Sequence, residues 1–355
     1  MRILHLLDEP YDSGIVHYAL KAAQGANRRG HACSVWGLEG RYPVLEAQRR
    51  GIPTRGYSHP WLDLPALRRF LKEDGTQLLV AHTGAGHSLA VAAAWSGGAG
   101  IPVIRTRGDA RPLRRRPGAG LLWSRTAGFI AANQVILDQF RELFGPEIPA
   151  AVVYEGREDP GPARPPANTA PTVGIVARLD PVKGHSVFLE AAAAAARTCP
   201  EARFLVVGRE ENVRSAELRE LAHRLGIAER TDFTGVVPDA LEYMRRCHVG
   251  VIASLGSEAI SRAAVEWMAV GRPLVSTRVG CLTEYVLEGR TGLLVPPGDP
   301  AALGAAMTAL LRDVFLRERL GQAGRRRYEE QFTMDRFLEE TERIYARAIR
   351  HPAHR

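Results

Sequence analysis

Short apolar segments alternate with helix-like segments along almost the whole chain, and this alternation restricts the fold more than any other feature. Such a pattern is typical of βαβ units, whose strands pair in parallel. We therefore predict an α/β protein with parallel sheets. The predicted strands are residues 2–7, 32–37, 78–82, 102–106, 128–133, 151–155, 172–178, 203–208, 231–235, 249–254, 273–277 and 292–296.

One segment interrupts the alternation. Residues 157–171, REDPGPARPPANTAP, are rich in proline and polar side chains, which is typical of a linker. A chain of 355 residues is long enough for two domains that each have a core. We predict domains over residues 1–165 and 166–330, with a ligand in the cleft between them.

The composition is that of an ordinary soluble protein, with 45% hydrophobic and 24% charged residues. No apolar run approaches the roughly 20 residues of a membrane span. The start, MRILHLLDEP, lacks the apolar region and cleavage site of a signal peptide. The cysteines have no zinc or CxxC spacing, so we expect buried thiols in a reducing cytoplasm. They are Cys33, Cys199, Cys247 and Cys281.

Most of the net charge of +8 lies before the end of the linker. The densest basic segment, residues 105–118, is loop-like and has no interleaved aromatic residues. No zinc-finger, RNP or helix-turn-helix signature accompanies it, which disfavours nucleic-acid binding. It is either a solvated loop or a contact for an acidic or phosphorylated acceptor, or for an anionic membrane surface. The candidate contacts are Arg107, Arg111, Arg114, Arg115 and Arg116.

Two glutamates, Glu258 and Glu266, lie around the start of a helical pattern in SLGSEAISRAAVEWMAVGRP, residues 254–273. If both are helical, their spacing corresponds to a rise of about 12 Å, close to the span from ribose to sugar in a nucleotide sugar. The N–H groups of the first helical turn would then face the phosphates. Alternatively, the two carboxylates are surface groups that favour the helix dipole.

A second candidate is ARLDPVKG, residues 177–184, which follows a predicted strand. Arg178 and Lys183 would lie at the carboxyl end of that strand, where open α/β sheets bind ligands. A guanidinium and an ammonium both suit phosphate oxygens. Lys183 is one of only three lysines in the chain and precedes a glycine. The alternative is a surface turn with two solvated cations.

Weaker signals come from glycines and one histidine at strand ends. Gly208 and Gly235 each end a predicted strand, and Gly14 lies in the first loop. Neither GxGxxG nor a Walker A sequence occurs, which argues against a dinucleotide-binding dehydrogenase and a P-loop ATPase. His82 should face the cleft and hydrogen-bond a sugar, unless it is only structural.

Five segments in residues 172–312 carry a family resemblance. ARLDPVKGHSVFLEAA, RFLVVG, DFTGVV, SEAISRAAVEWMAVGRPLVSTRVG and EGRTGLLVPPGDPAAL, in this order, closely resemble the GT-B retaining glycosyltransferases of family 4. AHTGAGHSLA and IPVIRTRGD resemble the N-terminal domain of that family. The resemblance implies two doubly wound, Rossmann-like domains facing across a cleft. The C-terminal domain would hold the nucleotide sugar and the N-terminal domain most of the acceptor.

The resemblance also implies that the C-terminal helix, residues 331–355, returns to the N-terminal domain. Truncation in the 330s should then destabilise both domains. No metal would be required, and the chain has no DxD sequence.

The resemblance implies a role for each candidate. Glu258 would contact the donor sugar and Glu266 the ribose. Arg178 and Lys183 would stabilise the diphosphate leaving group as charge develops on it. His82 would lie near the donor sugar. The other predicted donor contacts are the backbone of Ile260, Ser261 and Arg262, together with Gly14, Gly208 and Gly235.

One departure affects the donor. The family usually has an aromatic–glycine pair after the first glutamate, where this chain has Ile260–Ser261. We predict a retaining transferase that moves a sugar from a UDP- or GDP-sugar to an anionic glycan or lipid-linked acceptor at the inner membrane face, with lipopolysaccharide core as one candidate. The alternatives are a GT-B nucleotide-sugar epimerase and a non-catalytic module that binds sugar nucleotides.

Overall fold

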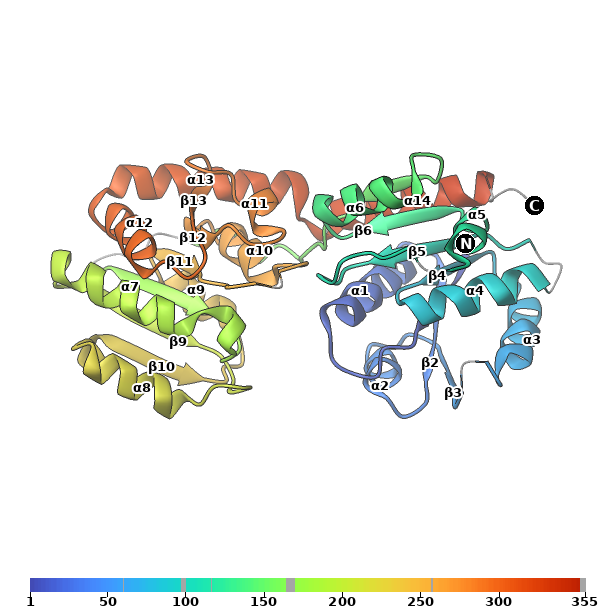
Figure 1. Cartoon of the computed structure of the whole chain (residues 1–355), viewed down its shortest axis with the longest axis horizontal. Helices are drawn as coiled ribbons and strands as arrows, with labels where there is room; N and C mark the ends of the chain where they lie inside the picture. The colour runs from blue at the N-terminus through green and yellow to red at the C-terminus, as the bar shows by residue number, and fades with distance from the viewer. Residues whose placement is uncertain (60, 97–99, 116, 164–169, 257, 352–355) are drawn as a thin grey trace. The chain divides into compact units, whose positions relative to one another are not determined.

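The computed structural model describes residues 1–351 except 60, 97–99, 116, 164–169 and 257 (Figure 1). The chain forms two compact units. Unit 1 comprises Met1–Gly156 and Met334–Arg355, and unit 2 comprises Arg157–Thr333. Unit 2 is therefore one continuous segment, inserted between the two parts of unit 1.

The predicted domain boundaries at 165/166 and 330/331 differ slightly from this division. The first part of the proline-rich segment belongs to unit 2, because Arg157 forms a β-bridge with Thr333 and the Ala163 N–H donates to the Val270 carbonyl. Residues 164–169 of the predicted linker lie outside the described residues.

Unit 1 contains a parallel sheet of order β3-β2-β1-β4-β5-β6-β7. Its strands are β1 (Arg2–Leu7), β2 (Ala32–Leu38), β3 (Thr54–Tyr57), β4 (Leu78–Ala81), β5 (Val103–Arg107), β6 (Gly128–Ala131) and β7 (Ala150–Val152). Its helices are α1 (Gly14–Arg28), α2 (Tyr42–Arg49), α3 (Leu64–Asp74), α4 (Gly84–Ser96), α5 (Ala119–Ser124), α6 (Gln134–Phe144) and α14 (Met334–Arg350).

Unit 2 contains a second parallel sheet, of order β10-β9-β8-β11-β12-β13. Its strands are β8 (Thr172–Val176), β9 (Arg203–Val207), β10 (Thr231–Gly235), β11 (Val249–Ile252), β12 (Leu274–Thr277) and β13 (Gly292–Val295). Its helices are α7 (His185–Thr198), α8 (Ser215–Arg224), α9 (Ala240–Arg246), α10 (Arg262–Ala269), α11 (Leu282–Tyr285), α12 (Pro300–Arg312) and α13 (Val314–Gln331), with 3-10 turns η1 (Pro181–Lys183) and η2 (Ala228–Arg230).

The prediction of doubly wound α/β sheets is confirmed, and every predicted strand has its counterpart in the structure. In each sheet the strand order runs outward in both directions from a central pair, β1/β4 in unit 1 and β8/β11 in unit 2. The strand prediction omitted β3, which is only 4 residues long.

Helix α10 is fixed to its sheet by one large aromatic side chain. Trp267 is fully buried and lies over β8 and β11 at two positions that have no side chain, Gly174 and Gly250. A Cβ atom on Gly250 would lie 2.4 Å from Cδ2 of the indole, so only glycine leaves room for the ring there. This close packing sets the position of α10 over the central strands of the sheet.

Helix α14 belongs to unit 1, although it follows unit 2 in the chain. It packs along α1, where Phe337 meets Tyr18 edge-to-face at 5.0 Å between ring centroids. Leu338 contacts α1 at Gly25, where a Cβ atom would lie 2.4 Å from Cδ2 of the leucine. Arg29, the C-cap of α1, also forms an ion pair with Asp335 at 2.9 Å. The helix is thus part of the unit 1 core.

Two expectations from composition can be compared with the structure. All four cysteines are buried and free, as predicted. None of the helices in the described part of the chain combines the length and the apolar character that crossing a membrane requires.

Candidate functional site

The strand order of unit 2 reverses at β8, which pairs with β9 on one side and β11 on the other. The loops after β8 and β11 leave the same edge of the sheet in opposite directions. Such a switch point, at the carboxyl ends of the strands, is where open α/β sheets bind ligands.

The two loops are held in direct contact. Gly184 has φ +69°, and a Cβ atom on it would lie 2.0 Å from the carbonyl oxygen of Ala253. The Leu255 N–H donates to the Val182 carbonyl at 2.8 Å. Glycine at position 184 is therefore required both by the left-handed backbone and by the close approach of the second loop.

Lys183 and Glu258, predicted separately, form one cluster. Nζ of Lys183 lies 2.5 Å from Oε1 of Glu258, and Oγ of Ser254 donates to the same oxygen at 2.5 Å. Glu258 is only 5% exposed, and its carbonyl accepts from the Cys281 N–H at 2.9 Å. A buried carboxylate needs such partners. Ser254 was not predicted as a site residue, although it ends a predicted strand four positions before Glu258.

Arg178 and Lys183 both lie near Asp180. Nε of Arg178 is 3.6 Å from Oδ2 of Asp180, and the arginine side chain is half exposed. Asp180 caps the 3-10 turn by accepting from the Val182 N–H at 3.0 Å, and it also accepts from Asn212 at 2.8 Å. Burial opposes ionisation of Asp180, but these hydrogen bonds and the nearby cations lower its pKa overall. Arg178 therefore stands next to a carboxylate that stays ionised.

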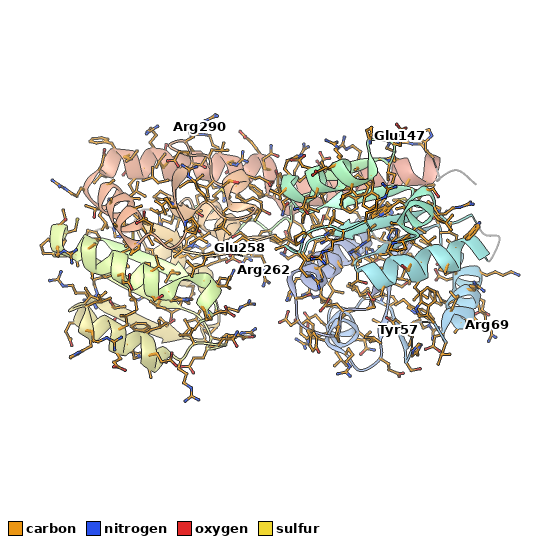
Figure 2. All side chains as sticks on the ribbon, viewed as in Figure 1. Tyr57, Arg69, Glu147, Glu258, Arg262 and Arg290 are labelled. Carbon is orange, nitrogen blue, oxygen red and sulfur yellow. The ribbon has the colours of Figure 1, made fainter. Side chains whose placement is uncertain are left out.

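The helical spacing argument for the two glutamates is wrong. Helix α10 begins at Arg262, with Ser261 as N-cap, so Glu258 lies in the loop before the helix and the 12 Å rise does not apply. Hydrogen bonds to the loops that follow β8 and β12 hold Glu258 outside the helix. Glu266 is helical, one turn after the exposed Arg262, and pairs with Arg157 at 2.6 Å. Figure 2 labels Glu258 and Arg262.

Four more of the predicted donor contacts lie in unit 2. Ser261 is buried, and its side chain makes no capping hydrogen bond to α10; Ile260 precedes it and is half-buried. The Gly208 N–H donates to the carbonyl of Gly235 at 3.1 Å, which ties the ends of β9 and β10 together. Both glycines therefore have a structural role that is independent of any ligand.

In unit 1, His82 does not face an open surface. It follows β4, is only 2% exposed, and its Nε2 lies 3.0 Å from Nδ1 of His5 on β1. The two rings stack at 5.3 Å. Burial lowers the pKa of His82 well below its usual value, since a charged imidazole would lose its hydration. Gly14, predicted in the first loop, is the first residue of α1.

The basic segment carries one internal acid. Asp109 Oδ1 lies 3.0 Å from Arg107 and 3.3 Å from Arg111. The Arg111 side chain is nevertheless 85% exposed, and Arg114 and Arg115 are exposed as well. Arg116 lies outside the described residues. The segment therefore presents several cations to solvent.

Two family patterns match the chain. Residues 170–313 match the family described as "Glycosyl transferases group 1", and residues 13–158 match "Glycosyltransferase Family 4". The first match covers most of unit 2, including the Lys183–Glu258 cluster and Glu266. The second covers most of the unit 1 sheet.

Individual glycosyltransferases are also similar to this chain in sequence. The phosphatidyl-myo-inositol mannosyltransferase of Mycobacterium leprae is 37% identical over 164 residues, 44% of this chain and 42% of that protein. The D-inositol 3-phosphate glycosyltransferase of Nocardia farcinica is 32% identical over 308 residues, 80% of this chain and 64% of that protein. The matched part is thus less than two thirds of either relative's length.

A solved structure extends the likeness over the whole chain. The crystal structure of Anabaena Alr3699/HepE in complex with UDP has a TM-score of 0.85 at 21% identity, covering 98% of this chain and 100% of that chain. At this identity the likeness concerns the fold. The two family matches show that the chain belongs to the group 1, family 4 glycosyltransferases, and the structural likeness shows that it has their GT-B fold.

Proposed function

We propose that the protein transfers a sugar from a nucleoside-diphosphate sugar to a hydroxyl group of an acceptor, with retention of anomeric configuration. The observation that carries this proposal is the cluster of Lys183, Glu258 and Ser254 at the switch point of unit 2. It combines a buried carboxylate, which can accept hydrogen bonds from sugar hydroxyls, with a cation for the diphosphate.

The roles follow from charge. Negative charge develops on the diphosphate as the glycosidic bond breaks, and fixed cations lower the barrier by stabilising it. Lys183 and Arg178 would supply this stabilisation. Glu258 would hold the hydroxyls of the donor sugar, and Glu266 those of the ribose. The donor is proposed to be a UDP- or GDP-sugar; HepE, of the same fold, has been solved with UDP-glucose.

The acceptor is proposed to be anionic. Exposed arginines in the segment after β5 support this, as do the names of the two relatives, which give phosphatidyl-myo-inositol and D-inositol 3-phosphate as what they act on. A lipid-linked or glycan acceptor at the cytoplasmic membrane face fits this charge, and lipopolysaccharide core is one example. Equal sedimentation with anionic and neutral vesicles would remove the membrane part of the proposal.

The first test is a thermal-shift screen with UDP, GDP, ADP and CMP and their common sugars, with and without magnesium. A ligand that binds only the folded state raises the melting temperature. We expect a rise with one diphosphate that does not depend on magnesium. No rise with any nucleotide would contradict the proposal. An epimerised donor formed without acceptor would favour the epimerase alternative.

Substitution of the cluster is the second test. Lys183→Met and Glu258→Gln should each lower kcat by about 10²-fold or more, because each removes a group that stabilises the transition state. The control is Arg224→Gln on α8, which breaks an exposed ion pair with Glu220 in the same unit. Circular dichroism checks folding. Folded variants with activity near wild type would refute the assignment.

A further inference from the structure

Arg157 is the first residue of unit 2, and its backbone is fixed at both ends of the residue. Its N–H donates to the Phe332 carbonyl at 2.9 Å, and its carbonyl accepts from the hydroxyl of Tyr328 at 2.9 Å. Proline-rich surroundings led us to predict a linker here. The structure instead holds Arg157 against the last turn of α13.

The side chain of Arg157 contacts α10, the helix that carries Glu266. Its Nη1 lies 2.6 Å from Oε1 of Glu266. The arginine side chain is 31% exposed and the glutamate side chain 15%. A charge-assisted contact of this length that is largely shielded from water fixes side-chain geometry better than an exposed pair does. Since Trp267 anchors α10 on the sheet, the guanidinium meets the carboxylate at a defined place.

We propose that Arg157 is a positioning residue for ribose recognition. It orients the carboxylate of Glu266 so that this group accepts hydrogen bonds from the ribose hydroxyls of the nucleotide. The inference rests on the proposed function, in which Glu266 is the ribose contact. An ionised carboxylate offers only acceptor sites, and the planar guanidinium restricts which way they point.

Alternatively, the ion pair between Arg157 and Glu266 has only a structural role, and this alternative makes a different prediction. If the ion pair only holds the start of unit 2 against α10, its loss weakens binding of every nucleotide in proportion to the loss of stability. If Arg157 orients Glu266, its loss weakens only ligands that have ribose hydroxyls. A second ion pair serves as a structural control, because Asp159, two residues after Arg157, pairs with Arg325 at 2.6 Å.

The experiment compares UDP and GDP with their 2′,3′-dideoxy forms by isothermal titration calorimetry. The proteins are wild type, Arg157→Met, Arg157→Lys, Glu266→Gln, the double variant Arg157→Met/Glu266→Gln, and the control Asp159→Asn. We expect wild type and Asp159→Asn to bind one ribose form about tenfold more tightly than its dideoxy form. Arg157→Met should lose this preference as completely as Glu266→Gln does, and the double variant should lose nothing more. Arg157→Lys should recover part of it.

Each contrary outcome has a separate meaning. A ribose preference that persists in folded Arg157→Met, with the ribose and dideoxy forms weakened equally, would show that the ion pair is only structural and would overturn the inference. Where Arg157→Met does not fold, full ribose preference in Glu266→Gln would overturn it. No ribose preference in wild type would also overturn it, while leaving nucleotide binding intact. No binding of UDP or GDP in wild type would refute the proposed function itself.

Discussion

The buried imidazoles of His5 and His82 make unit 1 sensitive to acid. In the described part of the chain, Nε2 of His5 and Nδ1 of His82 have no hydrogen-bond partner. Burial lowers the pKa of His5 to about 3, and burial together with His5 and Arg105 lowers that of His82. Both rings are therefore neutral near pH 7, and protonation of either would place a charge inside the core.

The direction of the pH effect follows from these pKa values. A histidine with a lower pKa in the folded state stabilises the protein above its unfolded pKa, about 6.5, and this contribution is lost as the pH falls towards the folded value. We expect His5 to lower the free energy of unfolding of unit 1 by up to about 1.4 kcal/mol per pH unit as the pH falls from about 6.5 to 3, and His82 to act in the same direction. Urea unfolding at pH 7.5 and 5.5 measures this.

A pair of variants tests the assignment to these residues. His5→Gln should make the acid dependence of unit 1 less steep, because a neutral amide cannot take up a proton in this range while His82 still can. His223→Gln, at an exposed position on α8, should leave it unchanged. An equally steep dependence in His5→Gln would show that other groups cause it.

Among the elements, the contact between the loops after β8 and β11 gives the sharpest prediction. Gly184→Ala should destabilise unit 2 by clearly more than Gly226→Ala. Both glycines have φ near +70°, so both substitutions carry a left-handed strain of about 1–2 kcal/mol. Only at Gly184 would the new Cβ lie 2.0 Å from a carbonyl oxygen; at Gly226 nothing lies within 4 Å. Equal melting temperatures would contradict the close approach.

The same elements show what the sequence can and cannot predict. Fully buried parallel strands are continuous apolar runs, so they were predicted with nearly correct ends. The edge strand β3, with the sequence TRGY, is too short and polar to be recognised. The spacing argument counted Glu258 as helical, because nothing in EAIS excludes a helix; hydrogen bonds from distant loops, such as that from Cys281, keep Glu258 out of α10.

The candidate site was predictable as a set of residues and not as an arrangement. Lys183 and Glu258 are 75 positions apart, and only the adjacency of β8 and β11 brings them together. The contact of Arg157 with α10 could not be predicted from the sequence for a different reason. The prolines that follow it are typical of a linker, and nothing local indicates that its guanidinium contacts α10.

At the scale of the whole molecule, α14 should matter to one unit only. Ending the chain after Thr333 should destabilise unit 1 and leave unit 2 folded, because α14 packs on α1 while α13 lies within unit 2. This prediction is narrower than the expectation from the sequence, which was that such a truncation affects both units. Hydrogen exchange measured by mass spectrometry should rise along α1 and β1. Equal deprotection of β8 and β11 would refute the prediction.

The insertion of unit 2 into unit 1 also has a consequence for synthesis. A ribosome completes residues 157–333 before it makes α14. The unit made second can thus reach its native state first, while the nascent unit 1 still exposes the face of α1 that carries Tyr18. Until translation reaches the last helix, that face is apolar surface open to chaperones.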